Sequence, residues 1–332
     1  MASIIATAPG RCGVVGNPSD MYGGSVISCT TEERAECRID LDTPHLELTN
    51  DGKHATVRTN VELRLVGDQL DVARAALTYF GIDPAMDRFT LSLRTDIPMR
   101  AGLAGSTALI AALVGALTAY RGQSQSPYLL AETTRKIEAR VLGIMCGFQD
   151  QHMTVFGGLN FMDFAGKEQL EQRDDEPFAT VEALANLVTV PPLLLAHTGV
   201  QHHSGVVHSS PRQRWLAGET LVRGNYARIA MLARMGKRAL IEEDWSALGA
   251  LMNENHSLVA ELGGSGPSNE ALISAARSAG ALGAKLAGAG GGGTILALTR
   301  EPERVGAALS AAGAHCILTP RPRPGLTVTR DE

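Results

Sequence analysis

Three glycine-rich segments hold most of the residues in this chain whose types and spacing could do chemistry. The first, second and third glycine segments cover residues 9–24, 98–107 and 285–293. Glycine allows the backbone to approach a ligand closely and to adopt positive φ angles. A glycine loop that leads into a helix points free backbone N–H groups at a ligand, and this arrangement favours an anion. Since GLAGSTA at residues 102–108 precedes the apolar stretch LIAALVGALTAY, it predicts an anion site at a helix start.

Ser106 and Thr107 fall at the beginning of that expected helix. Their hydroxyl groups could cap the helix by accepting backbone N–H bonds, or they could ligate a metal ion. Both interpretations follow from the same two side chains.

Two carboxylates form the other candidate group. Asp150 stands between two glutamines in MCGFQDQHMTVFGG, a glycine-bounded segment, where it could act as an acid–base group or cap a helix. Glu138 precedes it by twelve residues on an expected helix. The pair could converge on a metal ion and a hydroxyl group, although Glu138 also fits an exposed helix face.

Two familiar nucleotide motifs are excluded. A Walker A loop needs Ser or Thr after Gly-Lys, but the three Gly-Lys pairs here are followed by His, Glu and Arg. A GxGxxG pattern occurs at Gly288, Gly290 and Gly293, but a helical stretch precedes it and the strand-like TILALT follows it. This order is the reverse of a dinucleotide-binding unit.

A histidine cluster could suggest zinc, at His197, His202, His203 and His208. The chain has no HExxH pattern and no cysteine near these positions, so the spacing argues against a metal site. We expect residues 201–210 to form a substrate-contacting loop instead.

Composition limits the class of protein. The 332 residues are 44% hydrophobic with a net charge of −5, which predicts a substantial core and no general attraction to nucleic acid or anionic membranes. The five cysteines are scattered and never in CxxC spacing, which is typical of a reducing compartment. The N-terminus does not read as a secretory signal, and no apolar run approaches the ~20 residues needed to cross a bilayer. We therefore expect a cytoplasmic protein.

The hydrophobic patterning predicts a mixed α/β chain. In the first half it predicts strands at 3–9, 25–31, 36–41 and 89–98, a hairpin at 45–65, and helices at 68–81, 108–120 and 127–142. In the second half it predicts strands at 192–198 and 294–299, helices at 213–235, 238–262, 269–280 and 302–312, and a closing strand. A charged stretch after Phe164 suggests a boundary between domains 1–180 and 190–332.

Taken together and in order, APGRCGVVGNPSD, PMRAGLAGSTA and KLAGAGGGG resemble the three motifs of the GHMP kinases. The likeness spans residues 8–293. It departs from the family pattern in Ser-Thr at 106–107 where many members have Ser-Ser, in the four consecutive glycines of the third motif, and in Glu138, which lies in no sharp motif. It implies an α+β, two-domain GHMP kinase fold, with an N-terminal βαβ-containing ATP-binding domain and a C-terminal ferredoxin-like domain. GNPSDMYGG, GFQDQHMTVFGGLNFMDF and SGVVHSSPRQRWLAG are similar to sugar-1-kinases of the glucuronokinase type.

The resemblance also implies roles for individual residues. Asp150 and Arg11 would be catalytic, and Ser106 or Thr107 with Glu138 would hold Mg²⁺. The phosphates of ATP would lie on Gly102, Leu103, Ala104, Gly105, Ser106 and Thr107. The substrate would contact Asn17, Asp20, Gln149, Gly288, Gly290, Arg212 and Arg214.

The activity implied is ATP-dependent phosphorylation of the anomeric (C1) hydroxyl of a sugar, with glucuronate as the first candidate, to give a sugar 1-phosphate and ADP. Arabinose, galactose, a heptose phosphate or a non-sugar alcohol are alternative acceptors, and a non-catalytic sugar and nucleotide sensor is an alternative class. Arg212 and Arg214 could bind a sugar carboxylate by bidentate hydrogen bonds or form an exposed pair. We expect no nucleic acid or membrane partner, and the sequence leaves a homodimer open.

Overall fold

The computed structural model describes residues 2–41, 43–167, 176–200, 204–288 and 293–331. The larger of its two sheets has eight strands, in the order β12-β1-β2-β5-β3-β4, with β6 paired to β2 and β7 paired to β6. These strands are β1 (Ser3–Val15), β2 (Ser25–Asp40), β3 (Leu46–Asn50), β4 (Lys53–Val57), β5 (Thr90–Thr95), β6 (Leu159–Asp163), β7 (Thr180–Ala183) and β12 (Thr327–Asp331).

One strand pair in this sheet is parallel. β3 pairs in parallel with β5, and the connection between them contains β4, the short helix η2 (Asn60–Leu63) and α1 (Asp71–Tyr79). The other described pairs of the sheet are antiparallel. The predicted βαβ unit is therefore present beside an antiparallel framework.

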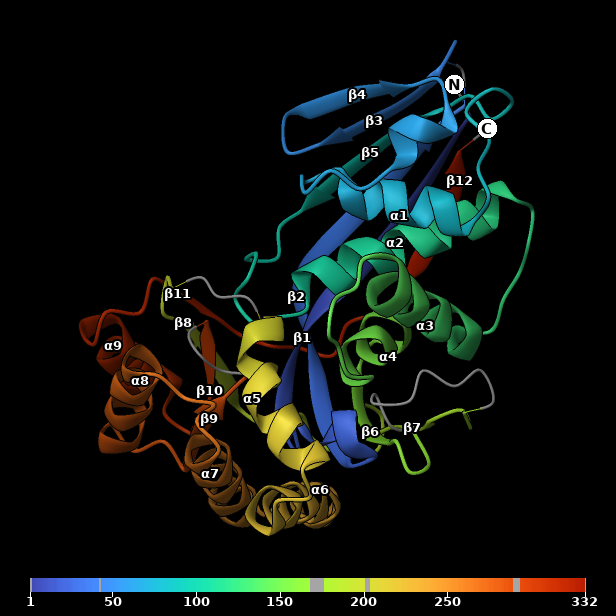
Figure 1. The fold of residues 1–332 in the computed structure, drawn as a ribbon. Helices are drawn as coiled ribbons and strands as arrows, with labels where there is room; N and C mark the ends of the chain where they lie inside the picture. Colours follow the sequence, from blue (N-terminus) through green and yellow to red (C-terminus); the bar gives the residue numbers. More distant parts are fainter. Residues whose placement is uncertain (1, 42, 168–175, 201–203, 289–292, 332) are drawn as a thin grey trace.

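Helix α2 (Gly105–Tyr120) is the central helix of this part of the chain. It packs on β1 and β2 and against α1, α3 (Pro127–Lys136) and α4 (Gln149–Phe156) (Figure 1). Almost all of its side chains are buried. Ser126 caps α3 as the sequence predicts, since its Oγ accepts from Leu129 N at 3.4 Å. Beyond α3 the chain forms one π-helical turn, η3 (Ile137–Val141). Such turns interrupt regular helices and often mark functional sites, and this one carries Glu138.

The second sheet is antiparallel, with the order β11-β8-β10-β9. Its strands are β8 (Leu193–His197), β9 (Gly283–Leu286), β10 (Thr294–Leu298) and β11 (Cys316–Leu318). The helices of this half are α5 (Ser204–Leu216), α6 (Thr220–Ile241), α7 (Trp245–Glu261), α8 (Pro267–Ser278) and α9 (Pro302–Ala311). Helices α8 and α9 pack on this sheet, whereas α6 reaches β1 and β2 of the first sheet (Figure 1).

Three expectations about elements are corrected. The strand expected at 3–9 continues through GRCGVV as far as Val15, because β2 supplies backbone partners that local residues do not indicate. The strands expected at 25–31 and 36–41 are one strand, β2. The helices expected at 213–235 and 238–262 are three helices: the breaks fall at Gly218, which has φ +78°, and at Asp244, whose carboxylate caps α7.

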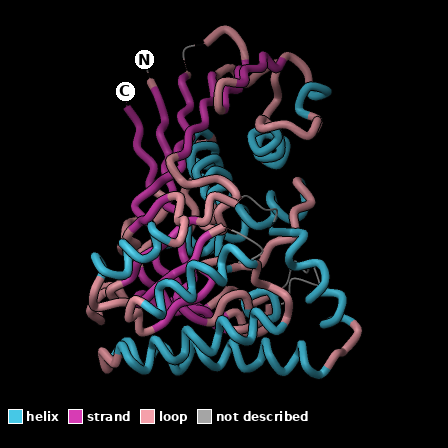
Figure 2. Tube along the Cα trace, turned by 90° about the vertical axis from the view of Figure 1, so that its left-hand side faces the viewer, coloured by secondary structure: helices cyan, strands magenta, loops and turns pink. Residues whose placement is uncertain are grey.

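The last strand belongs to the first sheet. β12 lies in the range expected for the C-terminal domain, yet it pairs antiparallel with β1, with Ser3 opposite Asp331. The two ends of the described chain therefore lie side by side (Figure 2). This pairing covers a backbone edge of β1 that would otherwise be open. Among the described helices, none is both long and apolar enough to cross a membrane.

Candidate active site

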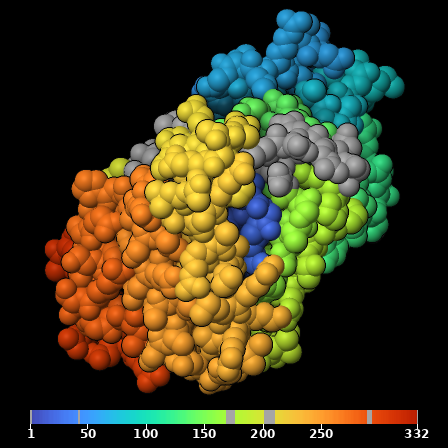
Figure 3. Space-filling view, turned by 60° about the horizontal axis from the view of Figure 1, so that its bottom comes forward, coloured from blue at the N-terminus to red at the C-terminus, as the bar shows by residue number. Residues whose placement is uncertain are grey.

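A cavity of about 1080 Å³ lies where the three glycine segments meet. Its walls include Arg11, Asn17, Asp20, Gly102, Ala104, Gly105, Ser106, Thr107, Glu138, Gly147, Gln149, Asp150 and Gly288. In the space-filling view, residues near the N-terminus are visible at the bottom of a groove beside α5 (Figure 3). Ligand pockets usually measure about 300–1,000 Å³, so this cavity has room for two small substrates.

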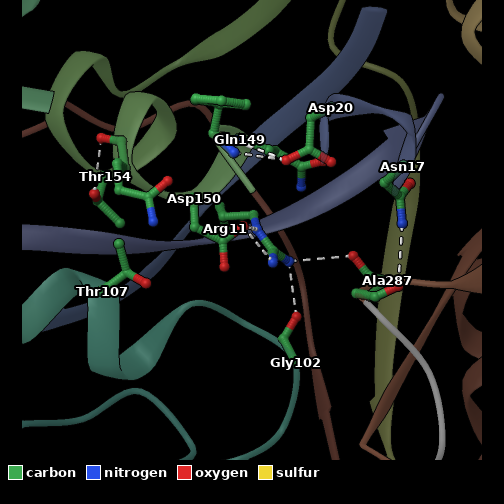
Figure 4. Close-up of polar contacts among 12 residues, drawn as sticks. Arg11, Asn17, Asp20, Gly102, Thr107, Gln149, Asp150, Thr154 and Ala287 are labelled. Atoms are coloured by element: carbon green, nitrogen blue, oxygen red, sulfur yellow. Dashed lines mark hydrogen bonds and ion pairs between the residues drawn. The ribbon is translucent and has the colours of Figure 1, made fainter. Parts of the chain in front are cut away.

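Arg11 joins the three glycine segments. Its Nη1 donates to the carbonyl oxygens of Gly102 at 2.8 Å and of Ala287 at 3.3 Å. Its Nε and Nη2 contact Asp150 Oδ1 at 2.7 and 2.6 Å (Figure 4). The Arg11 side chain is only 7% exposed, so these partners hold it in one orientation.

Asp150 lies in the first turn of α4, and its side chain is 29% exposed. Both contacts from Arg11 fall on Oδ1, so Oδ2 is the oxygen available to a group in the cavity. An ionised carboxylate in the first turn also interacts favourably with the helix dipole. This arrangement would allow Asp150 to act as an acid–base group oriented by a fixed cation.

Asp20 places a second carboxylate at the wall of the cavity. Its Oδ2 accepts from the backbone N–H groups of Phe148 at 2.8 Å and Gln149 at 3.0 Å. Burial raises the pKa of Asp20, and these two hydrogen bonds oppose the shift. The contact requires glycine at 147, because a Cβ there would lie 2.0 Å from Asp20 Oδ2.

The second glycine segment turns into α2 with two residues in the left-handed region. Gly102 has φ +77° and Ala104 has φ +61°, and Ala104 is the N-cap of α2 without a side-chain hydrogen bond. Ser106 and Thr107 therefore do not cap the helix. Leu103 does not line the cavity, but its carbonyl oxygen accepts from Arg11 N at 3.1 Å.

Thr107 and Glu138 meet at the cavity wall. Thr107 Oγ1 lies 3.1 and 3.0 Å from the two Glu138 carboxylate oxygens, and Gln151 Nε2 donates to Glu138 Oε2 at 2.8 Å. Burial raises the pKa of Glu138 to about 7, while donation from Gln151 opposes the shift and the charge of Asp150 adds to it. The buried Gln151 Oε1 has no partner in the described part of the chain.

This donor set fits Mg²⁺, which prefers oxygen ligands and is usually held by one or two protein groups together with substrate phosphates. Among the described residues, no cluster of three or more His, Cys, Asp or Glu side chains could hold a metal ion by itself. A metal here would therefore depend on oxygens from a bound ligand as well.

Asn17 lies against the third glycine segment. Its Nδ2 donates to the Gly288 carbonyl oxygen at 3.2 Å (Figure 4). Its Oδ1 accepts from Lys285 Nζ at 2.6 Å. Gly288 in turn approaches Gly102 so closely that a Cβ on it would lie 2.6 Å from the Gly102 carbonyl oxygen. Gly290 lies outside the described residues.

The two arginines of α5 differ, and neither lines the cavity. Arg214 forms a bidentate ion pair with Glu219, with Nε to Oε2 at 2.8 Å. Arg212 has a buried Nε without a hydrogen-bond partner among the described residues. Trp215, three residues after Arg212 on α5, packs on Tyr22 with ring centroids 4.3 Å apart, which places this part of α5 beside the first glycine segment.

The histidines do not form a described metal site. His197 is buried on β8, and its Nδ1 lies 3.0 Å from the Gly293 carbonyl oxygen. His202, His203 and the side chain of His208 lie outside the described residues.

Several contributors were not identified from the sequence. Gly147, Gln151 and Lys285 hold Asp20, Glu138 and Asn17 respectively, and none was a candidate. Gly147 begins the GFQD stretch and Gln151 follows it, so proximity to Asp150 is the one signal that could have indicated them. The cavity also extends to Asn50, Lys53, Asp68 and Gln69 beside the β3–β4 hairpin and α1, for which the sequence offered no signal.

Comparison with known proteins identifies the class. Residues 69–158 match the GHMP kinases N terminal domain, and residues 237–318 match the GHMP kinases C terminal model. The probable glucuronokinase 2 of Arabidopsis thaliana is 33% identical over 307 residues, which cover 85% of this chain and 81% of that protein. Mevalonate kinase of Pyrococcus horikoshii is 28% identical, covering 98% of this chain and 97% of that protein.

A solved structure confirms the fold. Lactococcus lactis galactokinase complexed with galactose superposes with a TM-score of 0.74 at 16% identity, covering 98% of this chain and 95% of that chain. The chain therefore belongs to the GHMP kinase family. It has the family's two-domain fold and is an ATP-dependent kinase.

Replacing Gly147 by alanine should displace the Asp20 carboxylate, because the added methyl group would lie 2.0 Å from Oδ2. We expect a loss of about 1–3 kcal/mol in unfolding free energy, the usual effect of overpacking, together with reduced kinase activity. Gly224→Ala on α6 is the matched control, because a Cβ there meets nothing within 4 Å. Urea unfolding and activity measurements on both variants test this, and equal behaviour of the two would contradict it.

Proposed function

We propose that this kinase transfers the γ-phosphoryl group of ATP to the anomeric hydroxyl of a sugar acid, with glucuronate as the acceptor. The products are the sugar 1-phosphate and ADP. The similarity to the probable glucuronokinase 2 of Arabidopsis thaliana, at 33% identity over 85% of this chain, supports this choice of acceptor.

The observation that carries the proposal is the Arg11–Asp150 pair at the wall of a cavity framed by the glycine segments. Phosphoryl transfer needs in-line positioning and neutralisation of charge more than covalent help from the protein. Residues 102–107 would position the phosphates, and Asp150 would meet the acceptor hydroxyl. A sensor without activity would not need a carboxylate oriented in this way.

The chemistry follows from these positions. The acceptor oxygen forms a bond to the γ-phosphorus while the bond to the β-phosphate oxygen of ADP breaks. The hydroxyl proton passes to Asp150 Oδ2, because Oδ1 is engaged by Arg11. Thr107 and Glu138, with Ser106 beside them, would hold Mg²⁺, which supplies positive charge to the phosphates when bound.

Acceptor recognition would use Asn17, Asp20, Gln149 and the backbone at Gly288, which line the same cavity. Arg212 is the better of the two arginines for a sugar carboxylate, because Arg214 is already paired with Glu219. A cytoplasmic location remains part of this proposal, as do domains 1–180 and 190–332 with β12 returning to the first sheet, and a homodimer stays open.

Asp150→Asn should lower kcat by roughly 10²–10⁴-fold while leaving ATP binding near normal, because the proton acceptor is lost and the nucleotide contacts remain. Steady-state kinetics and nucleotide titration measure the two effects. Asp163→Asn is the matched control, since Asp163 pairs with Arg234 outside the cavity. Turnover close to wild type in Asp150→Asn would overturn the assignment of the base.

Replacing Ser106 and Thr107 together by alanine should raise the Mg²⁺ concentration needed for half-maximal rate and lower turnover. If the Thr107 hydroxyl group only satisfies the buried Glu138 carboxylate, unfolding free energy should fall by roughly 1–3 kcal/mol with unchanged kinetics. Thr118→Ala, a buried position on the same helix, is the control for loss of a threonine. A Mg²⁺ titration run beside thermal melting distinguishes the two outcomes.

Glucuronate should be preferred over glucose and galactose by the wild-type enzyme, and Arg212→Lys should selectively reduce that preference. A lysine cannot reproduce the planar, bidentate contact of arginine with a carboxylate. Arg214→Lys is the matched control and should keep the preference. The measurement is kcat/KM across a panel that includes arabinose, a heptose phosphate, mevalonate and homoserine, with ³¹P–¹H coupling to locate the phosphate. If another acceptor has the highest kcat/KM, the assignment as a kinase stands and the assignment of glucuronate as acceptor is rejected.

A further inference from the structure

Lys285 on β9 is a buried cation that the proposed chemistry does not use. The residue is 1% exposed. Its Nζ lies 2.6 Å from Asn17 Oδ1, 2.6 Å from the Leu286 carbonyl oxygen and 3.2 Å from the Gly13 carbonyl oxygen. Across the described residues, no carboxylate forms an ion pair with it.

Burying an ammonium group without a counter-ion costs free energy, which hydrogen bonds to its partners must offset. Burial lowers the pKa of Lys285 to about 7, with Arg11 adding to the shift and Cys12 opposing it. On the α7 side, His256 is the titratable group that senses the charge of Lys285: burial lowers the pKa of His256, and Lys285 adds to that shift. An ammonium group has three N–H donors, and here three oxygens converge on it.

The three oxygens join the first and third glycine segments. Beside them, Gly13 N donates to the Ala287 carbonyl oxygen at 2.8 Å, and Asn17 Nδ2 donates to the Gly288 carbonyl oxygen at 3.2 Å. The fit is close, because a Cβ on Gly13 would lie 2.4 Å from Asn17 Oδ1. Without the ammonium group, Asn17 Oδ1 and two carbonyl oxygens would be left buried without this donor.

Lys285 itself does not line the cavity, whereas Asn17 and Gly288 do. We propose that Lys285 is a positioning residue, which holds the Asn17 amide and the backbone at Gly288 in the orientation that receives the acceptor. This inference rests on the proposed function, in which Asn17 and Gly288 contact the acceptor. Lys285 acts through these two groups and touches neither substrate.

The test is acceptor and nucleotide kinetics of Lys285→Met, Asn17→Ala and the double variant. We expect each single change to raise the acceptor KM about tenfold or more, with kcat and the KM for MgATP changed much less. The double variant should be no worse than the more damaged single variant, because both changes remove the same interaction. Additive effects, or an unchanged acceptor KM in Lys285→Met, would overturn the proposal.

Arg277→Met is the control for loss of a cation that bonds the backbone of β9, although the Arg277 side chain is itself exposed. Arg277 Nη2 donates to the Ala284 carbonyl oxygen at 2.8 Å and does not contact Asn17. We expect Arg277→Met to lower the melting temperature without changing the acceptor KM. An equal KM change in both variants would mean that Lys285 only stabilises β9, and would reject positioning.

Two further comparisons cover a variant that does not fold and a failure of the proposed function. If Lys285→Met does not fold, Lys285→Gln replaces it in the test, because glutamine keeps two N–H donors and removes the charge. The acceptor KM of Lys285→Gln should still exceed that of Arg277→Gln. Equal KM values in these two variants would reject the proposal. Failure of the proposed function is recognised separately, because Asn17→Ala would then leave the acceptor KM unchanged. A raised KM in Asn17→Ala with a wild-type KM in Lys285→Met rejects only this inference.

Discussion

The ion pair between Arg11 and Asp150 is the contact on which the arrangement of the site depends. One guanidinium group binds the carboxylate and the carbonyl oxygens of Gly102 and Ala287, so it contacts α4 and two of the glycine segments from a position on the first. These parts are separated by as many as 276 residues in the sequence. Because the guanidinium group is planar and rigid, its partners are held in a defined relative orientation. The direction in which Asp150 faces the cavity follows from this one side chain.

Burial of charge is the second constraint. Asp20, Glu138 and Lys285 are all nearly inaccessible to water, and burial moves the pKa of each toward its neutral form. Each is stabilised by neutral groups: backbone N–H groups for Asp20, a hydroxyl and an amide for Glu138, and three oxygens for Lys285. Such preorganised dipoles need little rearrangement when charge develops during phosphoryl transfer. The same arrangement makes the site sensitive to small changes, such as a methyl group at position 147.

Part of the site could be predicted from residue type and spacing. The glycine segments indicated an anion site, and Asp150, Glu138 and Thr107 indicated carboxylate and hydroxyl chemistry; the structure brings these side chains to one cavity. The helix after the second segment and the Ser126 cap also followed from local pattern. Gly147, Gln151 and Lys285 could not be found in this way. Each acts through a partner in another segment of the chain, and the sequence does not show that the two segments meet. The continuation of β1 to Val15 likewise depends on pairing with β2.

The sequence by itself determined the apolar core, the main helices, the glycine segments and the identity of the groups able to act on a phosphate. These features depend on side-chain chemistry and on contacts between residues close in the chain. Only the tertiary structure decided which oxygen of Asp150 is free, that Arg214 is paired with Glu219, and that β12 completes the first sheet. It also decided that Thr107 meets Glu138 and does not cap α2. Those outcomes depend on hydrogen bonds and close packing between segments far apart in the chain, and local pattern carries no record of such contacts.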